Sequence, residues 1–253
     1  MCHDTVDAPS SFAKLERACF RSCARSCCLH SLAMGVYLFV PNLIGYVRVV
    51  LMFVGYAYAL PGGRLGHDHT VTIAAYMFAQ LLDVADGHAA RMLNQSSKFG
   101  AVLDMVTDRT STTCFCIILA QLYPEYTMAF VGLVALDMFS HWFHMYTSVL
   151  VGQTSHKVVD HWLLRMYYWR PWLFLVCSGT ESWYMCLYTL KFTSGPVIYG
   201  VPFVVGFFRL CTIAFAFKQT ANVVQLLTAC NALVRHDEAE IQAVAKKAAS
   251  KKK

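Results

Sequence analysis

DVADGHAARMLNQSSKFGAVLDMVTD, residues 83–108, is the stretch that decides the fold. It places four aspartates, Asp83, Asp86, Asp104 and Asp108, inside otherwise apolar, membrane-like sequence. An aspartate at the centre of a membrane helix costs about 2.5–3.5 kcal/mol, and four close together would also repel one another. Something must therefore compensate these charges, and a divalent cation is the simplest candidate.

The spacing of the aspartates predicts a single geometry. Asp83 and Asp86 are three residues apart and Asp104 and Asp108 four, so each pair occupies one face of a helix. The polar break Asn-Gln-Ser-Ser at residues 94–97 predicts a tight turn between the helices. Residue 83 pairs with 108, and 86 with 104, about the same centre near this break. In an antiparallel helical hairpin the four carboxylates therefore converge.

Carboxylates are hard oxygen ligands, which suit Mg²⁺ or Mn²⁺. Two such ions would balance four negative charges, and paired metals hold phosphate oxygens during an in-line displacement at phosphorus. Gly87, Ala90 and Gly100 lack bulk, so a ligand or a backbone segment could come close to the helices. The alternatives are a buried ion-pair network and the proton relay of an ion-coupled transporter.

The composition is that of a polytopic membrane protein. Hydrophobic residues make up 57% of the 253 residues and charged residues only 14%, against about 25% charged in soluble domains. We expect an all-α integral membrane protein with six spans, near residues 40–60, 71–93, 98–121, 126–150, 171–191 and 197–218. Motif charges interrupt the second and third spans, as a polar active-site cavity requires.

Positive charge is distributed unevenly about these spans. With six spans, the basic clusters near residues 14–25, 91–98, 157–170 and 235–253 share one side, and the other side holds essentially Arg64 and Lys191. The positive-inside rule then places both termini and the mouth of the aspartate site in the cytosol. The net charge of +6 suits anionic membrane lipid, and no nucleic-acid-binding motif accompanies it.

We expect three parts: a cytosolic or interfacial segment at 1–36, the six-helix membrane domain at 37–230, and a basic cytosolic tail at 231–253. In the first part, three arginines at 17–25 and three cysteines at 19–27 form two stripes with a spacing of four. These stripes predict an N-terminal amphipathic helix at the membrane surface. We expect its thiols to serve as small apolar residues, with palmitoylation sites or zinc ligands as the alternatives.

The arrangement DxxDGxxAR, eight residues, then GxxxDxxxD resembles the signature of the CDP-alcohol phosphotransferases, and this chain matches all eight fixed positions. Flanking segments are also similar to the inositol-using branch of that family, the eukaryotic phosphatidylinositol synthases. These segments are LFVPNLIGYVR at 38–48, FGAVLDMVTDR at 99–109, LDMFSHWFH at 136–144, SHK at 155–157 and LRMYY at 164–168. The resemblance covers about residues 37–250 and leaves the segment before it unexplained.

The resemblance implies transfer of the phosphatidyl group from CDP-diacylglycerol to myo-inositol, with release of CMP. Glycerol phosphate or serine is the alternative acceptor. The metal ligands would be Asp83, Asp86, Asp104 and Asp108, with Asp108 also the general base. CDP-diacylglycerol would bind to Asn42, Arg48, Asp86, Gly87, Ala90, Arg91 and Gly100. For Arg48 the alternative is snorkelling to the interface. A homodimer in the endoplasmic reticulum membrane is also implied, with the Golgi as a further location.

The fourth expected span carries a polar stripe, with Asp137, His141 and His144 at i, i+4 and i+7. Such a stripe predicts side chains that hydrogen-bond a polyol, here inositol. A hydrogen-bonded seam between helices is one alternative, and a metal site is the other. Further candidates for inositol binding are Ser140, His156, Lys157, Arg165 and Tyr167.

Overall fold

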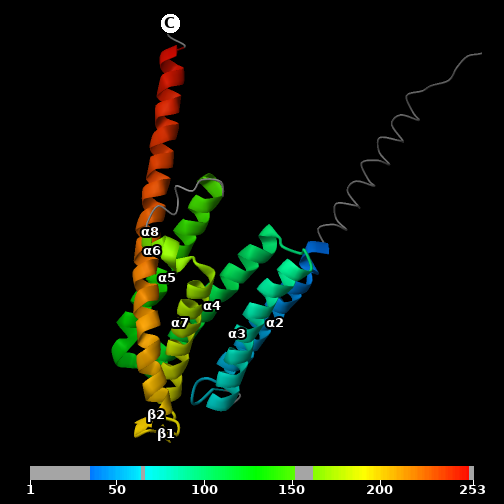
Figure 1. Ribbon diagram of the computed structural model, residues 1–253, viewed down its shortest axis with the longest axis vertical. Coiled ribbons are helices and arrows are strands. Elements are labelled where there is room, and N and C mark those ends of the chain that lie inside the picture. The colour runs from blue at the N-terminus through cyan, green and yellow to red at the C-terminus, as the bar shows by residue number, and fades with distance from the viewer. Residues whose placement is uncertain (1–34, 64–65, 152–161, 251–253) are drawn as a thin grey trace, which may run out of the picture. The chain divides into compact units, whose positions relative to one another are not determined.

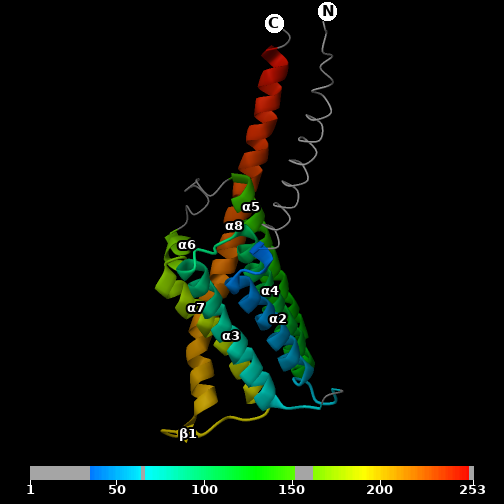
Figure 2. The ribbon, with the colours of Figure 1, turned by 90° about the vertical axis from the view of Figure 1, so that its right-hand side faces the viewer.

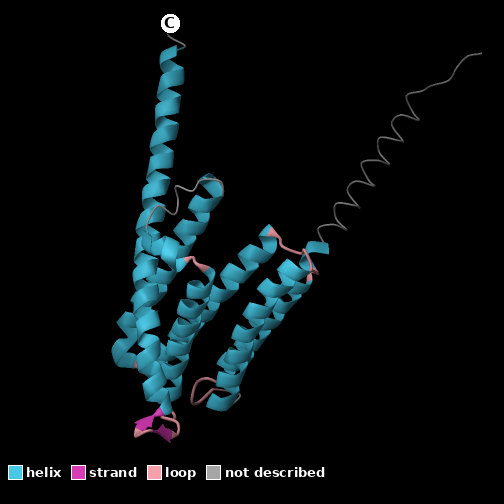
Figure 3. Ribbon diagram, in the orientation of Figure 1, coloured by secondary structure: helices cyan, strands magenta, loops and turns pink. Residues whose placement is uncertain are grey.

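The computed structural model describes residues 35–63, 66–151 and 162–250 (Figure 1). Within these ranges the chain is almost entirely helical, and its one sheet is a short hairpin (Figure 3). The helices are α2 (Val40–Ala57), α3 (His69–Met92), α4 (Lys98–Leu122), η1 (Pro124–Tyr126), α5 (Thr127–Val151), α6 (Trp162–Tyr167), α7 (Arg170–Leu190) and α8 (Phe203–Ser250). The hairpin consists of β1 (Val197–Ile198) and β2 (Val201–Pro202). The predicted N-terminal amphipathic helix lies outside the described residues.

Among the described residues, three helical stretches are long and apolar enough to cross a membrane: α2, Pro124–Leu150 (η1 with most of α5), and α8. The other expected spans, α3, α4 and α7, have 24, 25 and 21 residues. At 1.5 Å per residue each could reach across a hydrocarbon core of about 30 Å. Their sequences are more polar, however, and α3 and α4 carry the motif charges. The protein is thus an all-α membrane protein.

The last expected span begins later than predicted and runs further. Tyr199 and Gly200 have φ angles of +51° and +78° and form the two-residue turn that pairs β1 with β2, as a left-handed hairpin turn requires. The apolar run from residue 197 therefore starts as a hairpin, and α8 begins at Phe203. This helix of 48 residues is about 72 Å long, so it extends well beyond a bilayer core. The expected tail boundary at residue 230 falls inside it.

The described residues form two compact units. The first comprises residues 35–50 and 78–106, which include the start of α2, the end of α3 and the start of α4. The second comprises residues 51–77 together with the described residues from 107 onward.

In the first unit, the turn between α3 and α4 lies where the sequence predicts it. Asn94 has a φ of +53°, and the Gln95 N–H donates to the Ala90 carbonyl at 3.0 Å, which is the pattern of a Schellman helix end. The Ser97 hydroxyl then caps α4 by accepting from the Gly100 N–H at 2.9 Å. Each helix end is therefore satisfied locally, and the reversal needs only five residues.

In the second unit, α8 packs along both α5 and α7 (Figure 2). The apolar core is aromatic and draws on α3, α4, α5 and α7 through Tyr76, Phe115, Phe130 and Tyr188. The Tyr188 hydroxyl donates to the Ala59 carbonyl at 3.0 Å, so the loop after α2 is also fixed to this core. The C-terminal part of α8 projects past α5 (Figure 1), and residues 237–250 are exposed.

Candidate active site

The acidic centre of the first unit is built around Arg48. This residue lies on α2, is only 3% exposed, and directs its guanidinium at carboxylates from two other helices. Its Nη2 lies 2.5 Å from Asp83 Oδ1, and its Nη1 lies 2.8 Å from Asp86 Oδ2 and 2.9 Å from Asp104 Oδ1. The motif spacing thus brings Asp83 and Asp86 of α3 together with Asp104 of α4, as predicted.

These three carboxylates outnumber the guanidinium that binds them. The Asp86 side chain is 10% exposed, whereas that of Asp104 is 50% exposed, so the centre is open on one side. Oxygens of Asp83 and Asp104 lie within 4.8 Å of each other, close enough to share one ion. The remaining negative charge and the all-oxygen donor set fit a divalent cation such as Mg²⁺ or Mn²⁺.

The fourth motif carboxylate, Asp108, follows one helical turn after Asp104 on α4 and belongs to the second unit. Its side chain is 33% exposed, and the guanidinium of the next residue, Arg109, lies 3.7 Å from its Oδ2. Asp108 is therefore accessible and has a cation beside it.

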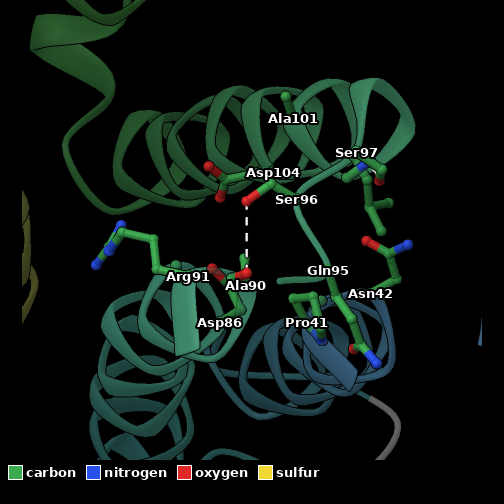
Figure 4. A pocket seen from close by; sticks show the side chains of 14 residues that line it. Pro41, Asn42, Asp86, Ala90, Arg91, Gln95, Ser96, Ser97, Ala101 and Asp104 are labelled. Atoms are coloured by element: carbon green, nitrogen blue, oxygen red, sulfur yellow. Dashed lines mark hydrogen bonds between the residues drawn. The ribbon is translucent and has the colours of Figure 1, made fainter. Parts of the chain in front are cut away.

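A cavity of about 180 Å³ lies in the first unit, beside the acidic centre. Asp86 and Asp104 point into the space between α3 and α4, and Arg91 and Asn42 lie at opposite edges (Figure 4). Six of the seven residues predicted to bind CDP-diacylglycerol line this cavity: Asn42, Asp86, Gly87, Ala90, Arg91 and Gly100. The seventh, Arg48, instead binds the carboxylates, and its burial argues against snorkelling to the interface.

Two motif glycines permit close approach of other side chains. A Cβ on Gly100 would lie 2.7 Å from Asn42 Oδ1 and 3.1 Å from Ser97 Oγ, which is too close for a real side chain. At Gly87 a Cβ would lie 3.5 Å from an Arg91 guanidinium nitrogen. Gly100 is therefore required to seat Asn42, whereas a Cβ at Gly87 would make only ordinary contact with Arg91.

The polar stripe on α5 takes part in a buried network of the second unit. Arg109 Nη1 donates to both carboxylate oxygens of Asp137, to Oδ1 at 2.7 Å and to Oδ2 at 2.9 Å. His141 Nδ1 lies 2.8 Å from the Asp137 carbonyl. From α8, Lys218 donates to Asn222 Oδ1 at 2.8 Å. Each of these groups therefore already has a protein partner.

The other predicted inositol residues are dispersed. The Tyr168 hydroxyl lies 3.3 Å from His144 Nε2 and donates to Gln225 Oε1 at 3.1 Å. Tyr167 is buried at 3% exposure, Ser140 donates to the Asp137 carbonyl, and Arg165 on α6 is exposed. His156 and Lys157 lie outside the described residues.

A scan against protein-family models matches residues 38–234 to the model described as CDP-alcohol phosphatidyltransferase. The match spans well over half of the chain, including the acidic centre and the cavity. The chain belongs to the CDP-alcohol phosphatidyltransferase family. The chain has the required residue at all eight fixed positions of the family signature.

Curated members of the family are similar over most of their length. The human CDP-diacylglycerol–inositol 3-phosphatidyltransferase is 42% identical over 210 residues, covering 81% of this chain and 95% of the human protein. The Drosophila melanogaster enzyme of the same name is 44% identical over 165 residues, covering 65% and 71%. The Schizosaccharomyces pombe enzyme of that name is 39% identical over 233 residues, covering 83% and 95%. No solved structure matches the chain significantly.

Sequence reasoning missed several polar residues inside this family member's helices. The sequence predicts no function for Arg109, although it follows Asp108 directly, and none for Lys218 and Asn222 on α8. Glu181 on α7 binds the Tyr76 hydroxyl and lies 3.3 Å from Thr112 Oγ1. A signal was present for Glu181 and Lys218, because an ionisable residue inside an apolar span marks a partnered site.

Proposed function

We propose that the protein is a phosphatidylinositol synthase, which transfers the phosphatidyl group of CDP-diacylglycerol to myo-inositol and releases CMP. The observation that carries the proposal is the convergence of Asp83, Asp86 and Asp104 on Arg48, beside a cavity that the motif residues Gly87, Ala90, Arg91 and Gly100 line. The relatives named for this reaction, which match over most of the chain, support inositol as the acceptor.

Asp83, Asp86, Asp104 and Asp108 would hold two Mg²⁺ or Mn²⁺ ions. Bound there, the ions would neutralise charge on the pyrophosphate. An inositol hydroxyl attacks the phosphorus that bears diacylglycerol, the new P–O bond forms, and the bond to the CMP oxygen breaks. Asp108 accepts the proton of the attacking hydroxyl, because a carboxylate held beside the nucleophile can act as a general base.

The cavity of the first unit is our candidate for the cytidine diphosphate subsite. Arg91 would make charge-assisted hydrogen bonds to phosphate oxygens, and the Asn42 amide, held by its donation to the Val36 carbonyl at 2.6 Å, would present its oxygen to the nucleotide. Gly87 and Ala90 lack bulk and therefore leave space for a ligand on the α3 side of the cavity. The acyl chains would remain in lipid, which explains why a membrane fold hosts the reaction.

For the acceptor subsite, which would bind inositol, we propose a set of residues without a role for each one. Inositol presents six hydroxyls and needs several hydrogen-bonding partners, and the stripe of Asp137, His141 and His144 offers both donors and acceptors. Because these groups are engaged with Arg109, Lys218 and Tyr168, a bound polyol would have to exchange with those partners. Arg165, Tyr167, His156 and Lys157 complete the proposed set.

We further propose six spans, with both termini and the active site in the cytosol, for a homodimer in the endoplasmic reticulum membrane. The asymmetry of lysine and arginine supports this orientation. The length of α8 agrees with it, since a helix of 48 residues that begins at one membrane surface must project from the other.

The test is product formation by purified protein from radiolabelled CDP-diacylglycerol, with inositol, glycerol phosphate and serine as acceptors and with Mg²⁺, Mn²⁺ or EDTA. We expect CMP release that depends on inositol and on a divalent cation. Product from glycerol phosphate or serine with none from inositol would change the acceptor. Absence of CMP release with every acceptor would leave an ion-coupled transporter as the better reading.

A further inference from the structure

The position of Arg48 differs from the one that the sequence predicts. A residue that borders a nucleotide site should line the cavity, yet the cavity is lined by its neighbours on α2, Pro41, Asn42 and Gly45. Arg48 lies one helical turn further on and contacts Asp83, Asp86 and Asp104. Its side chain is directed at the groups that would bind metal.

The contacts of Arg48 occupy carboxylate oxygens that could also bind a cation. One carboxylate oxygen of each aspartate lies 2.5–2.9 Å from a guanidinium nitrogen. Such charge-assisted bonds are strong, and the burial of Arg48 limits screening by water and salt. A guanidinium also stays protonated at any relevant pH. The carboxylates therefore cannot serve a metal fully while Arg48 keeps these contacts.

We propose that Arg48 is a built-in counter-cation of the acidic centre, a positioning residue that holds the three carboxylates together and competes with the divalent ion for them. This inference rests on the proposed metal site. Without a metal, Arg48 offsets the repulsion among aspartates that lie on different helices. When a metal binds, the guanidinium gives up carboxylate oxygens, and its positive charge stays close to the phosphate-bearing substrate.

Competition and an ordinary structural role predict opposite changes in metal affinity when Arg48 is removed. A residue that only organises ligands would, when removed, weaken metal binding. A competing cation, when removed, strengthens it, because the attraction between the metal and the carboxylates is no longer offset by a like charge nearby. Arg48→Met removes the charge and keeps much of the apolar stem. Arg48→Lys keeps the charge but loses the fork that reaches three carboxylates.

The experiment measures Mn²⁺ binding to the purified full-length protein without substrate, by the loss of the free-ion EPR signal. We expect the dissociation constant of Arg48→Met to fall about tenfold and that of Arg48→Lys about threefold. Lys98→Met, which removes an exposed charge at the start of α4, is the matched control and should stay within about twofold of wild type. Unchanged or weaker binding by Arg48→Met would overturn the proposal.

Thermal melting gives a second readout. Without Mn²⁺, Arg48→Met should melt below wild type, because its carboxylates lose the guanidinium that offsets their repulsion, and saturating Mn²⁺ should raise its melting temperature by more than it raises that of wild type. An equal or smaller rise would contradict competition. If Arg48→Met does not fold, Arg48→Lys decides both measurements. Failure of the proposed function looks different: neither wild type nor any variant would bind Mn²⁺.

Discussion

The two charged clusters of this protein differ in how their charges are matched. In the acidic centre of the first unit, three carboxylates share one guanidinium, and one of them, Asp104, is half exposed. In the second unit, the Asp137 carboxylate binds Arg109 and also accepts a hydrogen bond of 3.4 Å from Asn222 of α8. Surplus charge beside a cavity costs stability and is explained by a ligand, whereas a matched and buried pair links helices.

The largest expected effect comes from the acidic centre. Asp86→Asn should lower inositol-dependent CMP release at least about 10³-fold, since metal-assisted charge stabilisation at phosphorus supplies several kcal/mol. The same change relieves repulsion, so the melting temperature without metal should not fall. If Asp86→Asn turned over within tenfold of wild type, or lost much stability, the acidic centre would not differ from the buried pair in the way proposed.

The matched pair should behave in the opposite way. Asp137→Asn leaves the Arg109 guanidinium buried without its carboxylate, and removing one partner of a buried pair costs about 3–5 kcal/mol. Chemical or thermal unfolding in detergent measures this loss. The double variant Asp137→Asn with Arg109→Met should recover part of it, because the buried guanidinium that lost its partner is also removed. A double variant that is less stable than the single one would contradict a simple pair.

A smaller effect is expected at the wall of the cavity. In Gly100→Ala the new Cβ would approach Asn42 Oδ1 to 2.7 Å, and relieving such a clash costs about 1–3 kcal/mol. The displaced Asn42 should also raise KM for CDP-diacylglycerol. Gly132→Ala on α5 is the control, since a Cβ there meets nothing within 4 Å. Equal melting temperatures and KM values for the two variants would show that Gly100 seats nothing.

The smallest effect is expected at the start of α3. Asp68 Oδ1 accepts the N–H groups of Thr70 and Val71 at 2.8 and 3.2 Å, and these hydrogen bonds hold the pKa of the carboxyl below its ordinary value of 3.8. The stabilisation is therefore present above that value and is lost as the pH falls through the lower folded pKa. Melting of Asp68→Ala should lie slightly below wild type at pH 7, and the gap should close as the pH falls below 3.8 through the folded pKa. A difference in melting temperature that persists at acidic pH would show that the ionised Asp68 carboxylate does not stabilise the start of α3.

Much of the first unit could be predicted because its determinants are local. Helix periodicity, the turn residues at 94–97 and the aspartate spacing act over short distances along the chain, and together they place the motif side chains on facing helices. Arg48 could not be placed in this way. Its contacts reach 35 to 56 residues along the chain, and the sequence does not tell which of several acceptors a long side chain chooses.

The second unit was harder to predict for the same reason. The stripe of Asp137, His141 and His144 was visible from its spacing, but its partners lie on α4, in the turn just after α6, and on α8. The start of α8 was misplaced because hydropathy cannot distinguish an apolar hairpin from an apolar helix, and the turn at Tyr199 and Gly200 decides between them. The extent of α8 beyond the bilayer depends on helix propensity that an apolar window does not register.

The most direct test of the central claim is the number of Mn²⁺ ions that the purified chain binds without substrate. The account predicts two ions for wild type, a loss of binding in Asp86→Asn, and two ions in the double variant Asp137→Asn with Arg109→Met. A wild-type chain that binds no Mn²⁺, or an Asp86→Asn variant that binds it undiminished, would contradict the claim that the acidic centre is the metal site.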